Sequence, residues 1–267
     1  MTLISLLAGV STDAWAKRTR SKRTKNVPSQ GHTFGVEADE SVAQQVNDPT
    51  SFLREIRIDT AIEHGAGSRH TTIEWIPTLS LPLGQRFRFE GGIPVLSNAP
   101  DDRDEVELGD IYASFAYIFW QSKDFNALVD FRIDLPTGHE IRGAGFSVTQ
   151  WHATLGSVIY TFEERDFLII PFVEYRRSIF GGAGSPEVSS LIGSVGLVYL
   201  LSQTSYVRSD WTVNFDEQNN WSDSALLNLE VGRIFRDRYS LALGYEIDLW
   251  GDAEIRNAAI VSVGYLF

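Results

Sequence analysis

The chain has 267 residues, a formal net charge of −12 at pH 7 and no cysteine. The acidic balance argues against a nucleic-acid-binding protein, which needs a basic face. No internal stretch of about 18 apolar residues occurs, which excludes membrane-spanning helices.

A short apolar run opens the chain. Residues 3–10 read Leu-Ile-Ser-Leu-Leu-Ala-Gly-Val, and Ala14-Trp15-Ala16 follows, which is typical of a secretory signal with a small-residue cleavage site. The positive residues that usually precede such a run are missing, which is consistent with a start further upstream. A buried N-terminal strand or a disordered leader is the alternative. We predict a signal peptide over residues 1–16.

A basic block follows this run. Residues 17–25 read Lys-Arg-Thr-Arg-Ser-Lys-Arg-Thr-Lys, and blocks of like charge are disordered in solution. Alone, such a block would resemble a nuclear signal or an RNA-binding arm, but the rest of the chain favours a solvated linker. We predict a flexible basic and polar segment over residues 17–50 and a folded domain over residues 51–267.

The run 125–135 is the clearest of a series of strand patterns. Apolar residues occupy every second position from Phe125 to Leu135. The other face is polar, with Asn126, Asp130, Arg132 and Asp134, apart from Leu128. A length of about 9–11 residues suits a strand that crosses a bilayer at a tilt, whereas strands in soluble proteins average about 5–6. The same period of two recurs at 52–64, 71–81, 85–95, 108–120, 147–160, 166–177, 189–201, 204–215, 224–235, 238–250 and 256–267.

The last run ends on an aromatic residue. Val263, Tyr265 and Phe267 alternate with Gly264 and Leu266. Termini of soluble domains usually fray and are polar, whereas a closed membrane barrel pairs its last strand with its first and places aromatic residues against lipid. We therefore predict that 256–267 pairs with 52–64. We also predict that Val263, Tyr265 and Phe267 form a C-terminal signal for the barrel-assembly machinery.

Short and longer connections alternate between the predicted strands. The short ones are 82–84, 121–123, 163–165, 202–203 and 236–237, and longer ones include 98–105, 136–145, 181–187 and 216–221. Bacterial membrane barrels have an even number of strands, short periplasmic turns and longer extracellular loops. The predicted fold class is therefore all-β: a transmembrane antiparallel up-and-down β-barrel of about 12 strands, in the outer membrane of a Gram-negative bacterium. The alternative is a soluble sandwich or lipocalin-like barrel with its apolar face inward.

The polar faces of these strands would line the lumen. They are rich in charges, with acids outnumbering bases, so an open pore would favour cations or neutral solutes. The alternative is that opposite charges pair across strands and plug the barrel. The predicted lumen-lining residues are Glu55, Arg57, Asp59, Glu63, Glu74, Arg86, Arg88, Glu90, Asp130, Arg132, Asp134, Glu174, Arg176, Arg208, Asp210, Glu230, Glu246, Asp248 and Arg256.

The histidines do not predict an enzyme. A lipid hydrolase needs a histidine that activates a nearby serine, and His152, which lies inside a strand pattern, has no serine at the alternate position. His64 and His70 flank a short loop, and Asp101–Glu105 is an acidic loop that could bind Ca²⁺ with lipopolysaccharide. Both are better explained as solvated loop residues, so we predict no catalytic residue, no metal and no cofactor.

Two neighbouring runs resemble a known hairpin. The segment 108–117, with Gly109-Asp110, and the segment 129–140, with Leu135-Pro136-Thr137-Gly138, are similar to a pair in the outer-membrane transporter-like proteins of the phenol-degradation meta-pathway family. The segment Asn47–Phe52 and the terminal Tyr-x-Phe fit the same family, so the resemblance spans about 47–267. It implies a β-barrel transporter or porin, for hydrophobic small molecules, and no catalytic residues.

These observations predict an outer-membrane channel or transporter-like protein for small solutes, with hydrophobic or aromatic molecules as the candidates that the resemblance supplies. The alternatives are a plugged structural or surface-interaction barrel and, least of all, a membrane lipid hydrolase. The expected partners are outer-membrane lipid, the assembly machinery during insertion and an unidentified small solute, but no nucleic acid.

Overall fold

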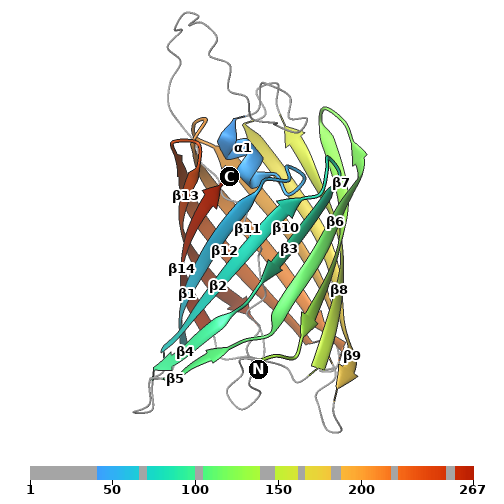
Figure 1. The fold of residues 1–267 in the computed structure, drawn as a ribbon, viewed down its shortest axis with the longest axis vertical. Helices are drawn as coiled ribbons and strands as arrows, with labels where there is room; N and C mark the ends of the chain where they lie inside the picture. The colour runs from blue at the N-terminus through green and yellow to red at the C-terminus, as the bar shows by residue number, and fades with distance from the viewer. Residues whose placement is uncertain are drawn as a thin grey trace, which may run out of the picture.

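A computed structural model describes residues 41–65, 71–99, 105–138, 148–161, 166–181, 188–217, 222–250 and 256–267 (Figure 1). The predicted signal peptide and the basic block lie outside these residues. Within them, no helix is long and apolar enough to span a membrane.

The described chain forms one antiparallel sheet that closes on itself, as Figure 1 shows. Its strands are β1 (Glu55–Gly65), β2 (Thr71–Pro82), β3 (Phe87–Gly92), β4 (Val95–Ala99), β5 (Glu105–Leu108), β6 (Ile111–Gln121), β7 (Phe125–Leu135), β8 (Val148–Thr161), β9 (Phe167–Gly181), β10 (Ser189–Leu200), β11 (Ser205–Asp216), β12 (Ser222–Phe235), β13 (Tyr239–Trp250) and β14 (Arg256–Leu266). The predicted all-β antiparallel barrel is confirmed.

The barrel closes between its first and last strands. β1 pairs with β14 over its whole length, from Glu55 opposite Leu266 to Gly65 opposite Arg256. This pairing confirms the partnership that the chain end predicted. Closure leaves no unpaired sheet edge at this seam, which lipid could not solvate.

Two of the twelve wall strands are broken. β3 and β4 are two pieces of one wall strand, because both pair with β2, at Thr78–Pro82 and Thr71–Trp75 respectively. β5 and β6 are two pieces of the next wall strand, since β5 pairs with β4 and β6 pairs with β3. The fourteen strands of the described chain therefore correspond to twelve crossings of the wall, as predicted. One break falls at Ile93-Pro94, because proline lacks the N–H that a continuous ladder needs.

The second break, at Gly109-Asp110, explains the Leu-Pro-Thr-Gly segment. The Thr137 hydroxyl accepts a hydrogen bond from the Ile111 N–H (2.8 Å) and donates one to the Gly109 carbonyl (3.1 Å). The Gly138 N–H donates to the Asp110 carboxylate (2.8 Å). The segment after β7 thus supplies the partners that the interrupted strand lacks.

Replacing Thr137 with valine is expected to lower the stability of the barrel at this break. Valine keeps the shape of threonine but removes both hydroxyl hydrogen bonds, each worth about 0.5–1.5 kcal/mol at most for a surface position. We expect the urea midpoint of unfolding in detergent to fall by the equivalent of about 1 kcal/mol. Thr137→Ser keeps the hydroxyl and should behave like the parent chain; equal stability of the two variants would contradict this role.

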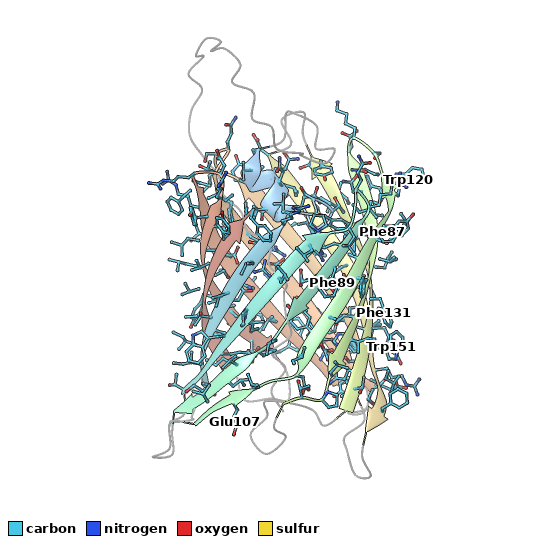
Figure 2. All side chains as sticks on the ribbon, viewed as in Figure 1. Phe87, Phe89, Glu107, Trp120, Phe131 and Trp151 are labelled. Atoms are coloured by element: carbon cyan, nitrogen blue, oxygen red, sulfur yellow. The ribbon has the colours of Figure 1, made fainter. Side chains whose placement is uncertain are left out.

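The wall is apolar outside and polar inside. On the outer face, Val129 and Phe131 of β7 are 42% and 46% exposed, whereas on the inner face Arg208 and Asp210 of β11 are 5% and 2% exposed. Figure 2 shows Phe131 on the outside of the barrel. A soluble barrel has the opposite arrangement, so the soluble alternative is excluded and the barrel is of the outer-membrane type.

One end of the barrel carries short turns. The strand bounds leave connections at 83–86, 122–124, 162–166, 201–204 and 236–238 at this end, and at 66–70, 100–104, 136–147, 182–188, 217–221 and 251–255 at the other. The alternation is present but smaller than predicted, because several strands extend further than their sequence patterns. We call the two ends of the barrel the short-turn end and the long-loop end. In bacterial barrels the short turns face the periplasm.

A short helix, α1 (Val42–Asn47), lies at the short-turn end beside the C-terminus (Figure 1). The sequence predicts a flexible segment here, and the structure differs for these residues. Ser41 caps the helix by accepting a hydrogen bond from the Gln44 N–H (3.1 Å), and the Ala43 N–H donates to the Gln203 carbonyl of a turn (3.2 Å). A helix this short is not stable alone, so its order comes from packing.

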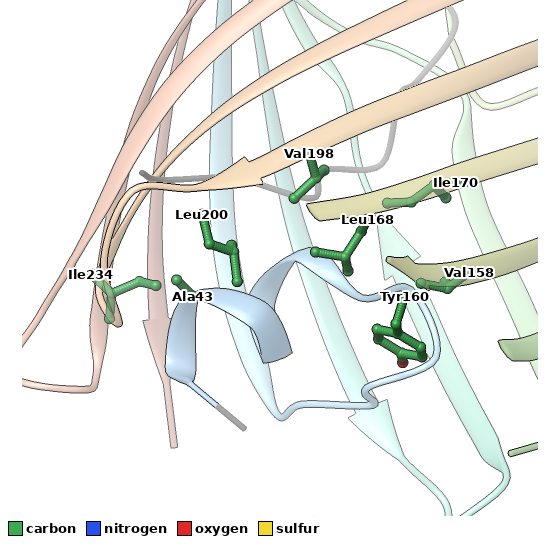
Figure 3. Close-up of a cluster of buried hydrophobic side chains, with 8 residues drawn as sticks. All are labelled: Ala43, Val158, Tyr160, Leu168, Ile170, Val198, Leu200 and Ile234. Carbon is green, nitrogen blue, oxygen red and sulfur yellow. The ribbon is translucent and has the colours of Figure 1, made fainter. Parts of the chain in front are cut away.

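The packing partner of α1 is an apolar cluster on the inner wall. Ala43 is fully buried, and Val42 and Val46 pack against the same cluster. Figure 3 shows Ala43 on α1 beside Leu200 and Ile234. The wall contributes Val158, Tyr160, Leu168, Ile170, Val198, Leu200 and Ile234 from β8, β9, β10 and β12.

Candidate functional site

The predicted lumen-lining residues occupy the inward positions of the wall, with one exception. All those whose side chains are described are buried or half-buried except Arg86. Arg86 is exposed in the turn 83–86 before β3. The prediction extended the alternation of β3 into the turn, where it does not hold. The side chain of Arg256 lies outside the described part.

Each lumen arginine with a described side chain has a carboxylate two positions away on its own strand. Residues i and i+2 of a strand share one face, which brings Arg132 Nη2 within 2.6 Å of Asp134 Oδ1 and Arg208 Nη2 within 2.6 Å of Asp210 Oδ1. The same arrangement recurs for Arg57 with Glu55 and Asp59, Arg88 with Glu90, and Arg176 with Glu174.

His152 joins two of these pairs across three strands. Its Nε2 lies 2.5 Å from Asp134 Oδ2 on β7, and its Nδ1 lies 3.0 Å from Glu174 Oε1 on β9. The Thr154 hydroxyl donates to the other oxygen of Glu174 (3.2 Å). Because both ring nitrogens face carboxylates and the ring is 4% exposed, His152 links the charge network rather than activating a nucleophile.

Charges from separate parts of the wall also interact. Arg57 on β1 interacts electrostatically with Glu90 on β3 and with Tyr112 on β6, and it also lies in the electrostatic range of Tyr206 on β11. Arg88 on β3 reaches Asp130 on β7 (3.7 Å). Together with the ion pairs within strands, these interactions form a belt of charges on the inside of the wall.

Two tyrosines of the belt cover glycines on the next strand. Tyr112 lies over Gly92, its hydroxyl is 3.0 Å from the Thr78 hydroxyl, and the Arg132 guanidinium lies 3.9 Å from its ring centre. Tyr206 covers Gly232 in the same way. A side chain on either glycine would occupy the place of the ring, so these positions require glycine.

A second set of polar contacts holds the segment after α1 in the lumen. The Asp48 carboxylate accepts hydrogen bonds from the Thr50 N–H (2.7 Å), the Thr50 hydroxyl (2.5 Å) and the Tyr160 hydroxyl. Asn126 donates to the Thr50 hydroxyl (2.8 Å) and to the Tyr160 hydroxyl (2.9 Å). We call these four residues the latch, because they tie the chain before β1 to β7 and β8.

The lumen thus has two successive zones. At the short-turn end, α1, the apolar cluster and the latch occupy the inside of the wall. The belt of charges begins beside this zone, where the Arg88 guanidinium lies 5.4 Å from the ring centre of Phe52, and extends along the wall to Asp134 near the long-loop end of β7. A solute crossing the barrel would have to pass both.

Several of these residues were not predicted as site residues. They are Tyr112, Tyr206, His152, Asn126 and the latch residues of the N-terminal segment. Tyr112, Tyr206, His152 and Asn126 do occupy inward positions of their runs, and that alternation could have found them. The predicted lumen-lining set contains only residues with a formal charge, and these four side chains have none.

The candidate metal-binding groups of the sequence lie only partly within the described residues. Among the described residues, no group of three or more histidine, aspartate or glutamate side chains could hold a metal ion. The His64–His70 pair and the acidic loop 101–105 lie, in whole or in part, outside those residues.

The proposed terminal signal lies on the outer face. Val263 and Phe267 are each 52% exposed. Tyr265 stacks with Phe267 (6.3 Å between ring centres) and makes a tilted ring contact with Tyr239 of β13 (5.3 Å). Figure 2 shows further aromatic residues on the outside, with Trp120 near the short-turn end and Trp151 nearer the other. Aromatic girdles at both interfaces are typical of membrane barrels.

No family model and no curated protein matches this chain. Solved structures do. The COG4313 outer membrane channel from Pseudomonas putida F1 is 12% identical, with a TM-score of 0.65, covering 82% of this chain and 99% of that one. The NanC porin is 7% identical, with a TM-score of 0.59 and coverage of 79% and 98%. The KdgM porin in complex with disordered oligogalacturonate is 11% identical, with a TM-score of 0.52 and coverage of 80% and 99%. At these identities the likeness is one of fold, and the fold is that of outer-membrane channels and porins.

Proposed function

We propose that this barrel is a gated outer-membrane channel or transporter for small solutes. The observation that carries the proposal is a closed membrane barrel whose inner wall is lined by charged side chains at its middle. A barrel of twelve strands lies between filled eight-stranded barrels and open sixteen-stranded porins, so its passage is narrow. Paired charges there would select solutes by size and charge.

The class of solute is part of the proposal. Acids exceed bases on the inner wall, which favours cations or neutral molecules over anions. The resemblance to the phenol-degradation meta-pathway family adds small hydrophobic or aromatic molecules as candidates. No catalytic residue is assigned, and Val263, Tyr265 and Phe267 are proposed as the contact with the assembly machinery.

A second candidate is a plugged structural barrel. It is favoured by the position of α1, which is packed against the inner wall and tied to it through the latch. In that case the barrel would serve envelope integrity or surface contact, and its lumen would not conduct under any condition.

Planar bilayer recordings test the proposal. We expect the purified barrel to give brief current steps, with a reversal potential in a KCl gradient that indicates a preference for K⁺ over Cl⁻. Ala43→Glu, whose helix cannot stay docked against the apolar cluster, should conduct more. If neither protein carries current at any voltage, the channel function is rejected in favour of the plugged barrel.

A further inference from the structure

Two lumen carboxylates differ from all the paired ones. Glu74 on β2 and Glu246 on β13 have no hydrogen-bonding or ion-pair partner within the described part of the chain. The electrostatic neighbour of Glu74 is Glu63, and those of Glu246 are Glu63 and Asp248. These interactions are repulsive.

The strand register gathers these carboxylates on one inner surface. Glu63 on β1 and Glu246 on β13 both lie opposite Ala258 of the strand between them, so their backbones are about 9–10 Å apart. Glu74 lies opposite Ala61 and is a diagonal neighbour of Glu63. The residues opposite these carboxylates, Ala61 and Ala258, have small side chains and no charge.

Glu74 lowers the stability of the barrel when no ligand is bound, because its carboxylate is buried without a partner among the described residues. It is 5% exposed, and its Oε2 is buried without a hydrogen-bond partner. A buried carboxylate without a partner is destabilising by several kcal/mol if it stays charged. For Glu90, Asp134, Glu174 and Asp210 an arginine two positions away offsets this cost. At Glu74 and Glu246 a positive group from outside the chain would do so.

The arrangement suits an organic cation better than a metal ion. Metal ions need several oxygen ligands within about 2.6 Å of one point, and no described group of residues offers that. Ammonium and guanidinium groups carry several N–H donors that can reach separate carboxylates. Both glutamates lie in the halves of β2 and β13 nearer the long-loop end, where a solute from outside the cell would enter.

We propose that Glu74 and Glu246 form a binding site for a solute with two or more ammonium or guanidinium groups, one for each carboxylate. The proposal deepens the channel function and rests on it, since it assigns the class of solute that the lumen captures first. Glu63 adds a third negative charge to this surface, and the proposed site does not depend on whether Glu63 has other partners.

Binding of spermidine to the purified full chain in detergent tests this site independently of conduction. Isothermal titration calorimetry should detect binding to the parent chain, and spermidine should raise its melting temperature. Glu74→Gln combined with Glu246→Gln should weaken binding at least tenfold. Glu217→Gln, which removes one negative charge from an exposed position at the long-loop end of β11, should change it less than twofold.

The outcomes separate the site from the channel. Equal spermidine binding by the double variant and the parent chain would overturn the site, and so would absence of binding to the parent chain. Binding of Ca²⁺ that abolishes the spermidine signal at equimolar concentration would also overturn it in favour of a metal site. If spermidine binds as expected but bilayers carry no current, the site stands and the channel function fails.

Discussion

Replacing Gly232 with alanine is expected to destabilise the barrel strongly. The ring of Tyr206 lies where the new Cβ would be placed, and Tyr206 is fully buried. The ring cannot move away without leaving its place beside Arg208 and Glu230. Overpacking of this kind costs about 1–3 kcal/mol, and displacement of a buried polar ring adds to it.

Urea unfolding in detergent, followed by heat-modifiable gel migration, measures the effect. We expect Gly232→Ala to lower the free energy of unfolding by about 2–3 kcal/mol. Gly193→Ala is the matched control, because a Cβ there meets no atom within 4 Å. Combining Gly232→Ala with Tyr206→Ala should cost no more than Tyr206→Ala alone, because the clash is then absent. Additive losses would show that the ring and the glycine do not depend on each other.

The wall of the barrel could be predicted from the sequence because each strand separates water from lipid. The run 125–135 has the same bounds as β7, and the predicted closure of the first and last strands agrees with the pairing of β1 with β14. A period of two leaves no freedom in which face is inward, so the inward position of Asp134 or Arg208 followed directly.

The interruptions of the wall could not be predicted in this way. Pro94 and Gly109-Asp110 both lie inside predicted runs, yet the regular strand pairing is interrupted at both points. The break at Gly109 depends on Thr137, a residue from the end of another strand. Local alternation carries no information about such a partner. Helix α1 was missed for a similar reason, since it needs the wall to be stable.

The site was predictable as a set of inward charges but not as a network. The sequence places Asp134 and Arg132 on one face, and their ion pair follows from the i, i+2 spacing alone. That His152 bridges Asp134 and Glu174 depends on the register of β7, β8 and β9. One residue of difference in either register would move the ring to the lipid face.

Replacing Ala43 with glutamate is expected to open the short-turn end of the lumen. Ala43 is fully buried among Leu200, Ile234 and other apolar side chains, and an unpaired carboxylate there costs several kcal/mol. Helix α1 has only six residues and is not stable away from the wall, so this penalty should release it. If undocking is favoured by about 3 kcal/mol, the ratio of open to closed barrels rises roughly a hundredfold.

Single-channel recording checks this expectation. Ala43→Glu should raise the open probability and the time-averaged conductance at least tenfold. Gln45→Glu adds the same charge to the same helix at a half-buried position and should change the conductance far less. The strands themselves should be unaffected, so both variants should keep the heat-modifiable migration of the parent chain. If Ala43→Glu folds but conducts no more than the parent chain, α1 does not close the lumen, and the belt of charges is then the barrier that limits passage.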